Sequence, residues 1–175
     1  MLVLDLSRIR TAQDRVEQVY GPEAFRVDPD DFRVAAPTSL AFDLFKDKRN
    51  FRLVGRVSTT LEMPCGRCLE PFVWPVDSGF DLRYQPHSAG TESEGEREVE
   101  EDDMTTSFYE NDEIDLVQLM QEQFYLTLPM KPLCREECKG LCSSCGTNLN
   151  RATCDCSTQW EDPRLAALKA LKKDS

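Results

Sequence analysis

Eight cysteines are the residues of this 175-residue chain whose type and spacing could support chemistry. Cys65 and Cys68 form a C-G-R-C motif near the middle of the chain. The other six lie within 23 residues, at Cys134, Cys138, Cys142, Cys145, Cys154 and Cys156. Thiols spaced in this way could bind a soft metal ion, form disulfides or take part in thiol–disulfide exchange.

Three explanations of the cysteine pattern fit it poorly: structural disulfides, a redox motif and the metal cluster of a radical enzyme. Structural disulfides need an oxidising compartment, and nothing in the sequence indicates export. A redox C-x-x-C motif would use one pair and leave six cysteines unexplained. The spacing Cys138-x3-Cys142-x2-Cys145 matches the cluster ligands of radical enzymes that use S-adenosylmethionine. That motif normally opens a large barrel, however, and only 30 residues follow Cys145.

Zinc fits the pattern best, because eight thiolates make two closed tetrahedral sites of four sulfurs each. A C-x-x-C motif at the tip of a hairpin can turn both of its sulfurs toward one ion. We expect Cys65 and Cys68 to share an ion with Cys134 and Cys138. The second, local site would then consist of Cys142, Cys145, Cys154 and Cys156. Closed sites leave no coordination position open, so both ions would be structural.

Two long strands must position the first cysteine pair. Apolar and polar residues alternate over residues 51–63 and again over 72–84, the pattern of half-buried strands. The two strands therefore form a hairpin with Cys65 and Cys68 at its tip. Pro75 and Gly79 indicate that the second strand bends and lies at the edge of a sheet.

The remaining expected elements are shorter. They are a strand over 2–9, a helix over 11–20, a strand over 40–45 followed by a KDKRN turn, a strand near 104–109, a helix capped by Asp115 that ends by Pro129, and a helix from Asp162. The predicted fold is α+β, an antiparallel β-sheet or partly closed barrel with one packed helix and a cysteine-rich, zinc-ribbon-like C-terminal segment. We expect an α+β domain over 1–130 with an acidic loop at 87–103, a zinc-binding segment over 131–160 and a terminal helix over 161–175.

The net charge of −11 is concentrated in one stretch of the chain. Residues 92–130 hold thirteen acidic groups and one basic group, whereas the other 136 residues carry a net charge of +1. The run Glu92–Asp103 cannot bury surface and is predicted to be a solvated connector. Acidity therefore does not exclude a nucleic-acid partner. No apolar run is long enough for a membrane helix, and the first ten residues are too charged for a signal peptide, so we expect a cytoplasmic protein.

The sequence does not predict catalysis. Its only histidine, His87, lies beside the acidic stretch and is expected to be a solvated loop residue. The eight glycines are scattered and form no phosphate-binding loop. Most carboxylates lie in a segment without the fixed geometry that acid–base catalysis needs.

Two segments of the chain resemble the bacterial YceD family, the large ribosomal RNA subunit accumulation proteins, which have plastid relatives. They are the C-G-R-C-L-E-P-F run that starts at Cys65, and LTLPMKPLCREECKGLCSSCGTNLN followed by Cys154 and Cys156. The order of the elements fits the family along nearly the whole chain. The resemblance implies a cytoplasmic, non-catalytic factor that is needed for accumulation of large-subunit (23S) ribosomal RNA and that binds precursor RNA or an assembling particle.

The expected partners are therefore ribosomal RNA or a pre-50S particle, with ribosomal proteins as a further candidate and neither a membrane nor a small-molecule substrate. Candidate RNA contacts are Arg52, Arg56, Arg67, Lys131, Arg135, Lys139 and Arg151. Each of these side chains could equally be solvated, ion-paired or offsetting the charge of the thiolates. Two other functions remain open: a zinc–thiol redox switch or chaperone-like sensor, and a zinc-ribbon adaptor of the transcription machinery.

Overall fold

The computed structural model describes residues 2–28, 31–87 and 106–156, and the chain divides into two compact units. The first unit runs to Pro64 and from Pro71 to Pro132. The second unit joins Cys65–Glu70, the tip of the long hairpin, to the cysteine-rich segment that begins at Leu133. The two units are described separately below.

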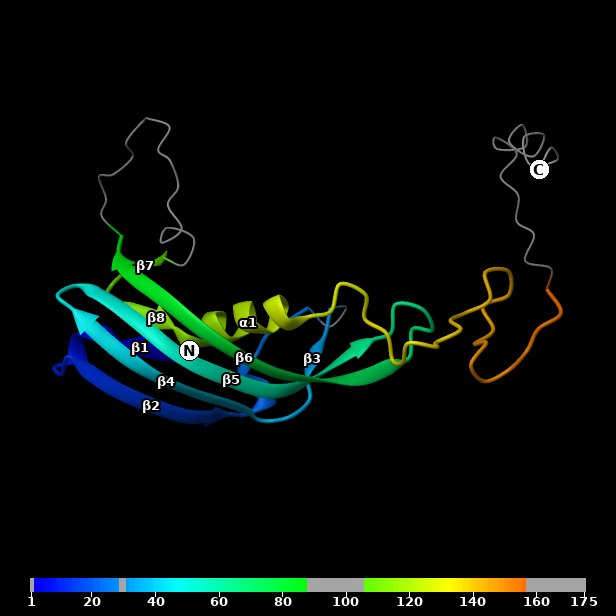
Figure 1. Ribbon diagram of the computed structural model, residues 1–175, viewed down its shortest axis with the longest axis horizontal. Helices are drawn as coiled ribbons and strands as arrows, with labels where there is room; N and C mark the ends of the chain where they lie inside the picture. Colours follow the sequence, from blue (N-terminus) through cyan, green and yellow to red (C-terminus); the bar gives the residue numbers. More distant parts are fainter. Residues whose placement is uncertain (1, 29–30, 88–105, 157–175) are drawn as a thin grey trace, which may run out of the picture. The chain divides into compact units, whose positions relative to one another are not determined.

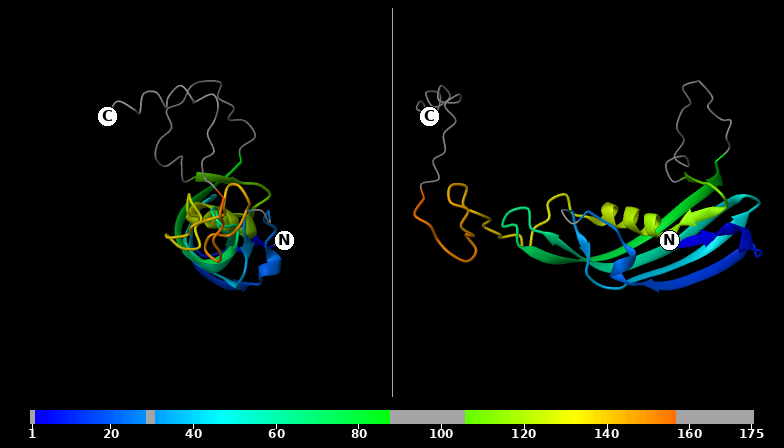
Figure 2. Two further views of the ribbon diagram at one scale, coloured as in Figure 1. Left: turned by 90° about the vertical axis from the view of Figure 1, so that its right-hand side faces the viewer. Right: turned by 180° about the vertical axis from the view of Figure 1, so that it is seen from behind.

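The first unit is built on an open sheet with strand order β2-β4-β5-β6-β7 and with β3 paired to β5. The strands are β2 (Gln13–Tyr20), β3 (Arg33–Val34), β4 (Thr38–Asp47), β5 (Asn50–Pro64), β6 (Pro71–Pro86) and β7 (Thr106–Tyr109). A second, two-stranded sheet pairs β1 (Val3–Asp5) with β8 (Glu113–Asp115). The helix α1 (Leu116–Thr127) lies along one face of the curved sheet (Figures 1 and 2).

The predicted hairpin of two long strands is confirmed. β5 and β6 pair antiparallel from Phe51 opposite Tyr84 to Pro64 opposite Pro71. The turn predicted after the preceding strand lies at Lys48 and Arg49, where Lys48 takes a positive φ of 56°. β7 pairs only with the last residues of β6 and runs parallel to it. The part of β6 that contains Pro75 and Gly79 therefore pairs with β5 as its one described strand neighbour.

The core of the first unit lies between the sheet and α1. Alternate residues of β4 and β5 are fully buried, among them Leu40, Leu53 and Val57. Helix α1 contributes Met120 and Phe124, which are also fully buried. The inward residues of α1 recur every three or four positions, so they face the sheet as one stripe.

The helix predicted over residues 11–20 is wrong, because this segment is the edge strand β2. Every residue from Gln13 to Tyr20 is paired with β4, from Phe45 back to Thr38. Only Tyr20 is buried, so the strand has little apolar alternation for a sequence pattern to reveal. Pairing with β4 satisfies the backbone hydrogen-bonding groups of this polar segment, and this outweighs the local preference of its residues for a helix. The opening strand is also shorter than predicted, since Leu6–Arg8 form a 3-10 turn.

Helix α1 begins at the predicted cap. The Asp115 carboxylate accepts hydrogen bonds from the backbone N–H groups of Val117 and Gln118 at 2.8 and 3.2 Å. In a capping box, the Gln118 side chain would also accept a hydrogen bond from the backbone N–H of Asp115. Here the Gln118 side chain instead donates to Glu122 at 2.9 Å. The helix ends at Thr127, two residues before Pro129, which cannot continue a helix.

Over residues 2–28, 31–87 and 106–156 the structure is mostly β-sheet with one α-helix, and the strands form open sheets that do not close into a barrel. The predicted acidic loop falls almost wholly outside the described residues, and the predicted helix after Asp162 lies beyond them. Within the described ranges, no helix has the length and apolar character to span a membrane.

Candidate metal centres

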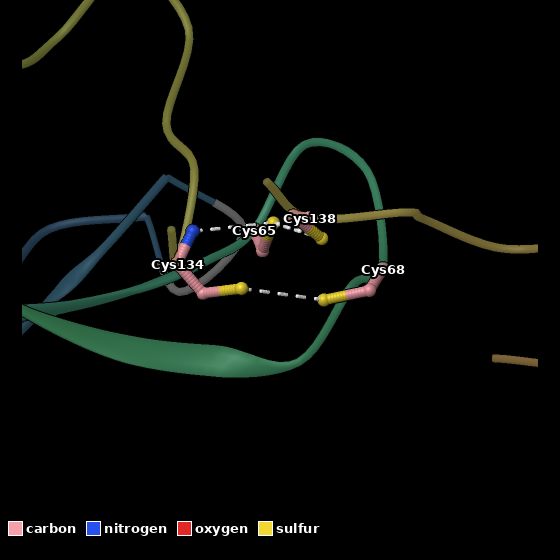
Figure 3. Close-up of side chains that lie close together, drawn as sticks. All are labelled: Cys65, Cys68, Cys134 and Cys138. Atoms are coloured by element: carbon pink, nitrogen blue, oxygen red, sulfur yellow. Dashed lines mark hydrogen bonds between the residues drawn. The ribbon is translucent and has the colours of Figure 1, made fainter. Parts of the chain in front are cut away.

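Four sulfurs of the second unit meet in a first cysteine cluster, formed by Cys65, Cys68, Cys134 and Cys138 (Figure 3). All four Sγ atoms lie within 4.8 Å of one another. The Sγ atoms of Cys65 and Cys138 are 3.8 Å apart, and so are those of Cys68 and Cys134. A zinc–sulfur bond of about 2.3 Å makes the edge of a tetrahedron about 3.8 Å long, whereas a disulfide bond measures about 2.05 Å. The spacing therefore fits four thiolates around one ion and does not fit disulfides.

The second cysteine cluster consists of Cys142, Cys145, Cys154 and Cys156, whose sulfurs also lie within 4.8 Å of one another. The structure thus divides the eight cysteines as the spacing suggested. That a metal ion fills either cluster stays a prediction. Four sulfurs without nitrogen or carboxylate oxygen form a soft donor set that suits zinc and leaves no position open for a substrate.

The two C-x-x-C turns have the same backbone geometry. In the first turn, the N–H of Leu69 donates to the carbonyl of Cys65 and the N–H of Cys65 donates to the carbonyl of Glu70, both at 2.9 Å. In the second turn, the N–H of Gly146 donates to the carbonyl of Cys142 at 2.9 Å and the N–H of Cys142 to the carbonyl of Thr147 at 2.8 Å. The fifth residue of each turn takes a positive φ, 60° at Leu69 and 72° at Gly146. Repetition of one turn in both clusters indicates that each holds its first two sulfurs in the same way.

Hydrogen bonds to sulfur favour two thiolates in the first cluster. Burial alone would raise the pKa of Cys65, but N–H groups of Cys68, Cys134 and Arg67 outweigh it and lower the pKa to about 6. Burial also opposes ionisation of Cys138. The Asn150 side-chain amide, which donates to the Cys138 sulfur at 3.3 Å, helps to bring the pKa of Cys138 below its usual value.

The other two thiols of the first cluster resist ionisation. Burial, followed by the neighbouring thiol of Cys138, raises the pKa of Cys134 to about 12. The N–H of Glu70 favours the Cys68 thiolate, but burial and the thiol of Cys65 outweigh it, so the pKa of Cys68 is raised. Four sulfurs in one place therefore disfavour a full set of thiolates, and a divalent cation at their centre would remove this repulsion.

The second cluster shows the same division. The N–H groups of Cys145 and Ser144 lower the pKa of Cys142. The hydroxyl and N–H of Thr147 lower the pKa of Cys145 to about 6. The neighbouring thiolates have the opposite effect on the last ligand, because Cys145, together with burial, raises the pKa of Cys156 to about 12.

Asn150 is the residue of this unit that sequence reasoning missed. Its Nδ2 donates to the Cys138 sulfur and to the Asn148 side chain, at 3.3 and 2.9 Å. Its Oδ1 accepts from the Lys139 N–H and from the Arg135 guanidinium, both at 2.9 Å. Asn150 lies between the second and third ligands of the second cluster, so its side chain connects that cluster's loop to a ligand of the first. No motif marks it, since a lone asparagine in a loop is usually a turn residue.

Other contacts also join the segments that carry the two clusters. The N–H of Leu141 donates to the Arg67 carbonyl at 3.1 Å. Gly140 has a φ of 75°, and a Cβ there would lie 3.0 Å from the same carbonyl. Only glycine fits this position without displacing the first turn. Gly140 and Gly146 thus both take the positive φ that the tight backbone of these loops requires.

Most of the candidate RNA contacts have partners within their own unit. On the first unit, Arg52 pairs with Asp81 and Arg56 with Asp77, and Lys131 is exposed. On the second unit, the Arg67 guanidinium donates to the carbonyls of Glu136 and Cys138 at 3.3 and 2.8 Å, which fastens the two halves of the first cluster together. The remaining second-unit contacts are Arg151 with Glu70 at 2.6 Å, Arg135 with Asn150, and an exposed Lys139.

His87 lies at the end of the described part of β6. Its N–H donates to the Tyr109 carbonyl at 3.0 Å, and its ring meets Phe108 edge-on, with 6.1 Å between the ring centroids. Among the described residues, it is not part of either cysteine cluster.

Comparison with known proteins gives relatives along most of the chain. It is 25% identical to the chloroplastic "Large ribosomal RNA subunit accumulation protein YCED homolog 1" of Arabidopsis thaliana, over 83% of this chain and 52% of that protein. It is also 25% identical to the protein of that name from Zea mays, over 69% of this chain and 48% of that protein. An uncharacterized protein of Mycobacterium tuberculosis is 35% identical over 55% of this chain and 44% of its own length. The chain thus spans about half the length of these relatives, and no solved structure matches it.

The model of one protein family matches residues 53–172, which begin in β5 and include all eight cysteines. The matched range therefore contains all but the first residues of the long hairpin, together with α1 and both cysteine clusters. With its hairpin turn and its cysteine-rich segment inside this match, the chain belongs to the YceD family, the large ribosomal RNA subunit accumulation proteins.

Proposed function

We propose that this protein is a non-catalytic, cytoplasmic ribosome-biogenesis factor that supports accumulation or processing of 23S ribosomal RNA. It acts by binding precursor RNA or the assembling large-subunit particle. The observation that carries the proposal is membership of a family named for accumulation of large-subunit ribosomal RNA. The two plant relatives bear the same description, and their similarity covers 83% and 69% of this chain.

In this proposal, each cysteine cluster holds one zinc ion with a structural role. The 3.8 Å sulfur separations and the repeated C-x-x-C turn support tetrahedral coordination by four thiolates. Bound zinc would supply folding free energy to the second unit, as in zinc-ribbon-like segments. The closed donor set favours a binding module over an enzyme. The division into an α+β domain, a zinc segment and a terminal helix is part of the same proposal.

The RNA contacts of the second unit are expected at Lys139, which is exposed, and at Arg135, which is exposed and donates to the neutral Asn150 side chain through one nitrogen. Arg67 and Arg151 already bind a carbonyl pair and a carboxylate, so they serve the unit itself. The described part of this unit carries four basic and four acidic side chains, and two zinc ions on eight thiolates would add a charge of −4. Phosphate binding must therefore depend on a few exposed cations, which limits its strength.

The arginines of β5 are weaker candidates for RNA binding. Arg52 donates to both carboxylate oxygens of Asp81, and Arg56 donates to Asp77 at 2.6 Å. A phosphate would have to displace these carboxylates. Exposed ion pairs of this kind are weak, so displacement costs little, but each arginine would leave an aspartate carboxylate close to the RNA phosphates.

Crosslinking in cells tests this proposal. Ultraviolet crosslinking followed by RNA sequencing is expected to recover 23S precursor, and sedimentation is expected to place the protein with pre-50S particles. Replacing Arg135 and Lys139 by glutamine should weaken binding and reduce its salt dependence, by a slope of about 1 for each lost phosphate contact. The matched control replaces Arg52 and Arg56 by glutamine. Absence of ribosomal RNA among the crosslinks, or salt-independent association, would contradict the proposal.

A thiol redox switch is the second candidate, favoured by one observation. Cys145 is exposed, and its pKa is lowered to about 6, the two properties of a reactive thiol. Bound zinc would protect this sulfur. Rapid alkylation of Cys145 in the native, metal-loaded protein would support the switch, and slow alkylation that accelerates only after chelation would support a structural site.

A further inference from the structure

A second kind of site lies on the first unit, where β7, β8 and the start of α1 meet β6. The described residues there enclose a pocket of about 300 Å³. Four carboxylates line it, and its described lining contains neither lysine, arginine nor histidine. The four carboxylates belong to Glu110, Glu113, Asp115 and Glu122. The pocket contains none of the cysteines or basic residues considered above.

Two of these carboxylates accept hydrogen bonds from described residues, and the other two do not. Asp115 caps α1, and Glu122 accepts the hydrogen bond from Gln118. The side chains of Glu110 and Glu113 are exposed and make no hydrogen bond or ion pair with the described residues. Their charges therefore remain available to a cation that enters the pocket.

A largely buried tyrosine also lines the pocket. Tyr84 on β6 is only 7% exposed, lines the pocket, and its hydroxyl has no hydrogen-bond partner among the described residues. Burial and the nearby charge of Glu122 raise the pKa of Tyr84 to about 12, so the hydroxyl stays neutral. Among the described residues, the one fully buried polar side-chain atom without a partner is Thr38 Oγ1, so the Tyr84 oxygen is accessible from the pocket, and a ligand that donates a hydrogen bond to it would replace solvent there.

The remaining lining combines the polar side chains of Ser107 and Gln118 with apolar and aromatic ones. Val3, Ile114 and Leu119 supply apolar side chains, and Phe108 lies at the pocket with 63% of its surface exposed. An aromatic face beside carboxylates suits a planar guanidinium, which stacks on rings and donates several hydrogen bonds. The apolar side chains suit the methylene stem of such a residue and are poor surroundings for a hydrated divalent ion.

We propose that this pocket binds an arginine side chain presented by a basic protein segment. Glu110 and Glu113 would face the guanidinium, the Tyr84 oxygen would accept one of its hydrogens, and Phe108 would cover its plane. Apart from Val3 and Tyr84, the lining residues belong to the stretch 92–130, which carries a net charge of −12 in the sequence. Such a charge would attract basic segments from a distance. The inference adds a protein-binding site to a chain proposed above to contact RNA.

Three short peptides test the proposal on the full chain with its metal bound. Each has glycine on both sides of one central residue, which is arginine, lysine or citrulline, the neutral analogue of arginine. Nuclear magnetic resonance at physiological salt measures binding through backbone shifts over residues 107–115. The arginine peptide is expected to bind about 10-fold more tightly than the citrulline peptide, because charge-assisted hydrogen bonds are lost with the charge.

Substitutions in the protein distinguish specific binding in the pocket from nonspecific electrostatic attraction to the acidic surface. Glu113→Gln should weaken the arginine peptide several-fold, whereas Glu23→Gln, which removes one exposed charge outside the pocket, should leave binding unchanged. Tyr84→Phe tests the hydroxyl while keeping the ring in the core. Equal binding of arginine and citrulline peptides would overturn the proposal, and so would equal effects of Glu113→Gln and Glu23→Gln. The same shifts produced more readily by Mg²⁺ or Ca²⁺ would also overturn it, in favour of a metal site.

Discussion

Replacing Asn150 by alanine should selectively weaken the metal ion of the first cysteine cluster. The substitution removes the donor that lies 3.3 Å from the Cys138 sulfur and the acceptor of the Lys139 N–H. It leaves all eight sulfurs in place. Groups that orient or hydrogen-bond a metal ligand commonly contribute 10- to 100-fold in affinity. We therefore expect about a 10- to 100-fold loss at the first cluster and a much smaller change at the second.

Zinc transfer to a coloured chelator measures this effect. The wild-type protein is expected to release two ions per chain, and Asn150→Ala should lose one of them at a much lower chelator concentration. Arg151→Ala is the matched control, because it breaks an exposed ion pair with Glu70 in the same unit without touching a sulfur. Its effect should be small.

A second substitution separates the hydrogen bond from the shape of the side chain. Asn150→Asp keeps the acceptor for the Lys139 N–H, but it replaces the donor at Cys138 by a negative charge. The aspartate should therefore weaken the first ion more than alanine does. The account of Asn150 is wrong if both variants release zinc as the wild type does, or if Arg151→Ala causes an equal loss.

Three further predictions concern the turns, the sheet and the two units. Leu69→Gly should tighten metal binding several-fold, because it relieves about 1–2 kcal/mol of strain from the positive φ of this exposed residue. Gly146→Ala should weaken metal binding by a similar factor, because it introduces the same strain. The same chelator competition measures both effects. Gly55→Ala places a Cβ 2.3 Å from the Ala41 carbonyl oxygen and should cost about 1–3 kcal/mol in urea unfolding, whereas Gly79→Ala, with its nearest neighbour at 3.8 Å, should be nearly neutral. Chelation of both ions should abolish hydrogen-exchange protection in the second unit and preserve it in β4–β6, because the core of the first unit contains no cysteine.

The parts of the fold that were predictable from the sequence are those with a local signal. The alternation over 51–63 and 72–84 identified β5 and β6, because one face of each strand is buried along its length. Asp115 was recognisable as a cap because its role depends on neighbouring backbone only. The two C-x-x-C turns were recognisable for the same reason, since each is a local structure that aims two sulfurs at one point. Cys134 and Cys138 were then left to complete the first cluster, although they lie far from Cys65 and Cys68 in the sequence.

The missed features depend on contacts between distant segments. Strand β2 has mostly exposed side chains and is a strand because β4 pairs with it. The parallel pairing of β7 with β6 joins segments that are separated by the acidic stretch of the sequence. Asn150 becomes informative only when the Cys138 sulfur is found beside it. The pocket around Tyr84 likewise combines residues of β6, β7, β8 and α1 that no motif connects.

The central claim is that this protein supports accumulation of large-subunit ribosomal RNA through a fold that includes two metal-bound cysteine clusters. The most direct test is the ratio of 23S to 16S ribosomal RNA in cells that lack the protein, with complementation by the wild type or by a Cys138→Ser, Cys142→Ser variant. We expect the ratio to fall on loss of the protein, to recover with the wild type and to stay low with the variant. An unchanged ratio on loss of the protein, or full recovery with the variant, would contradict the account.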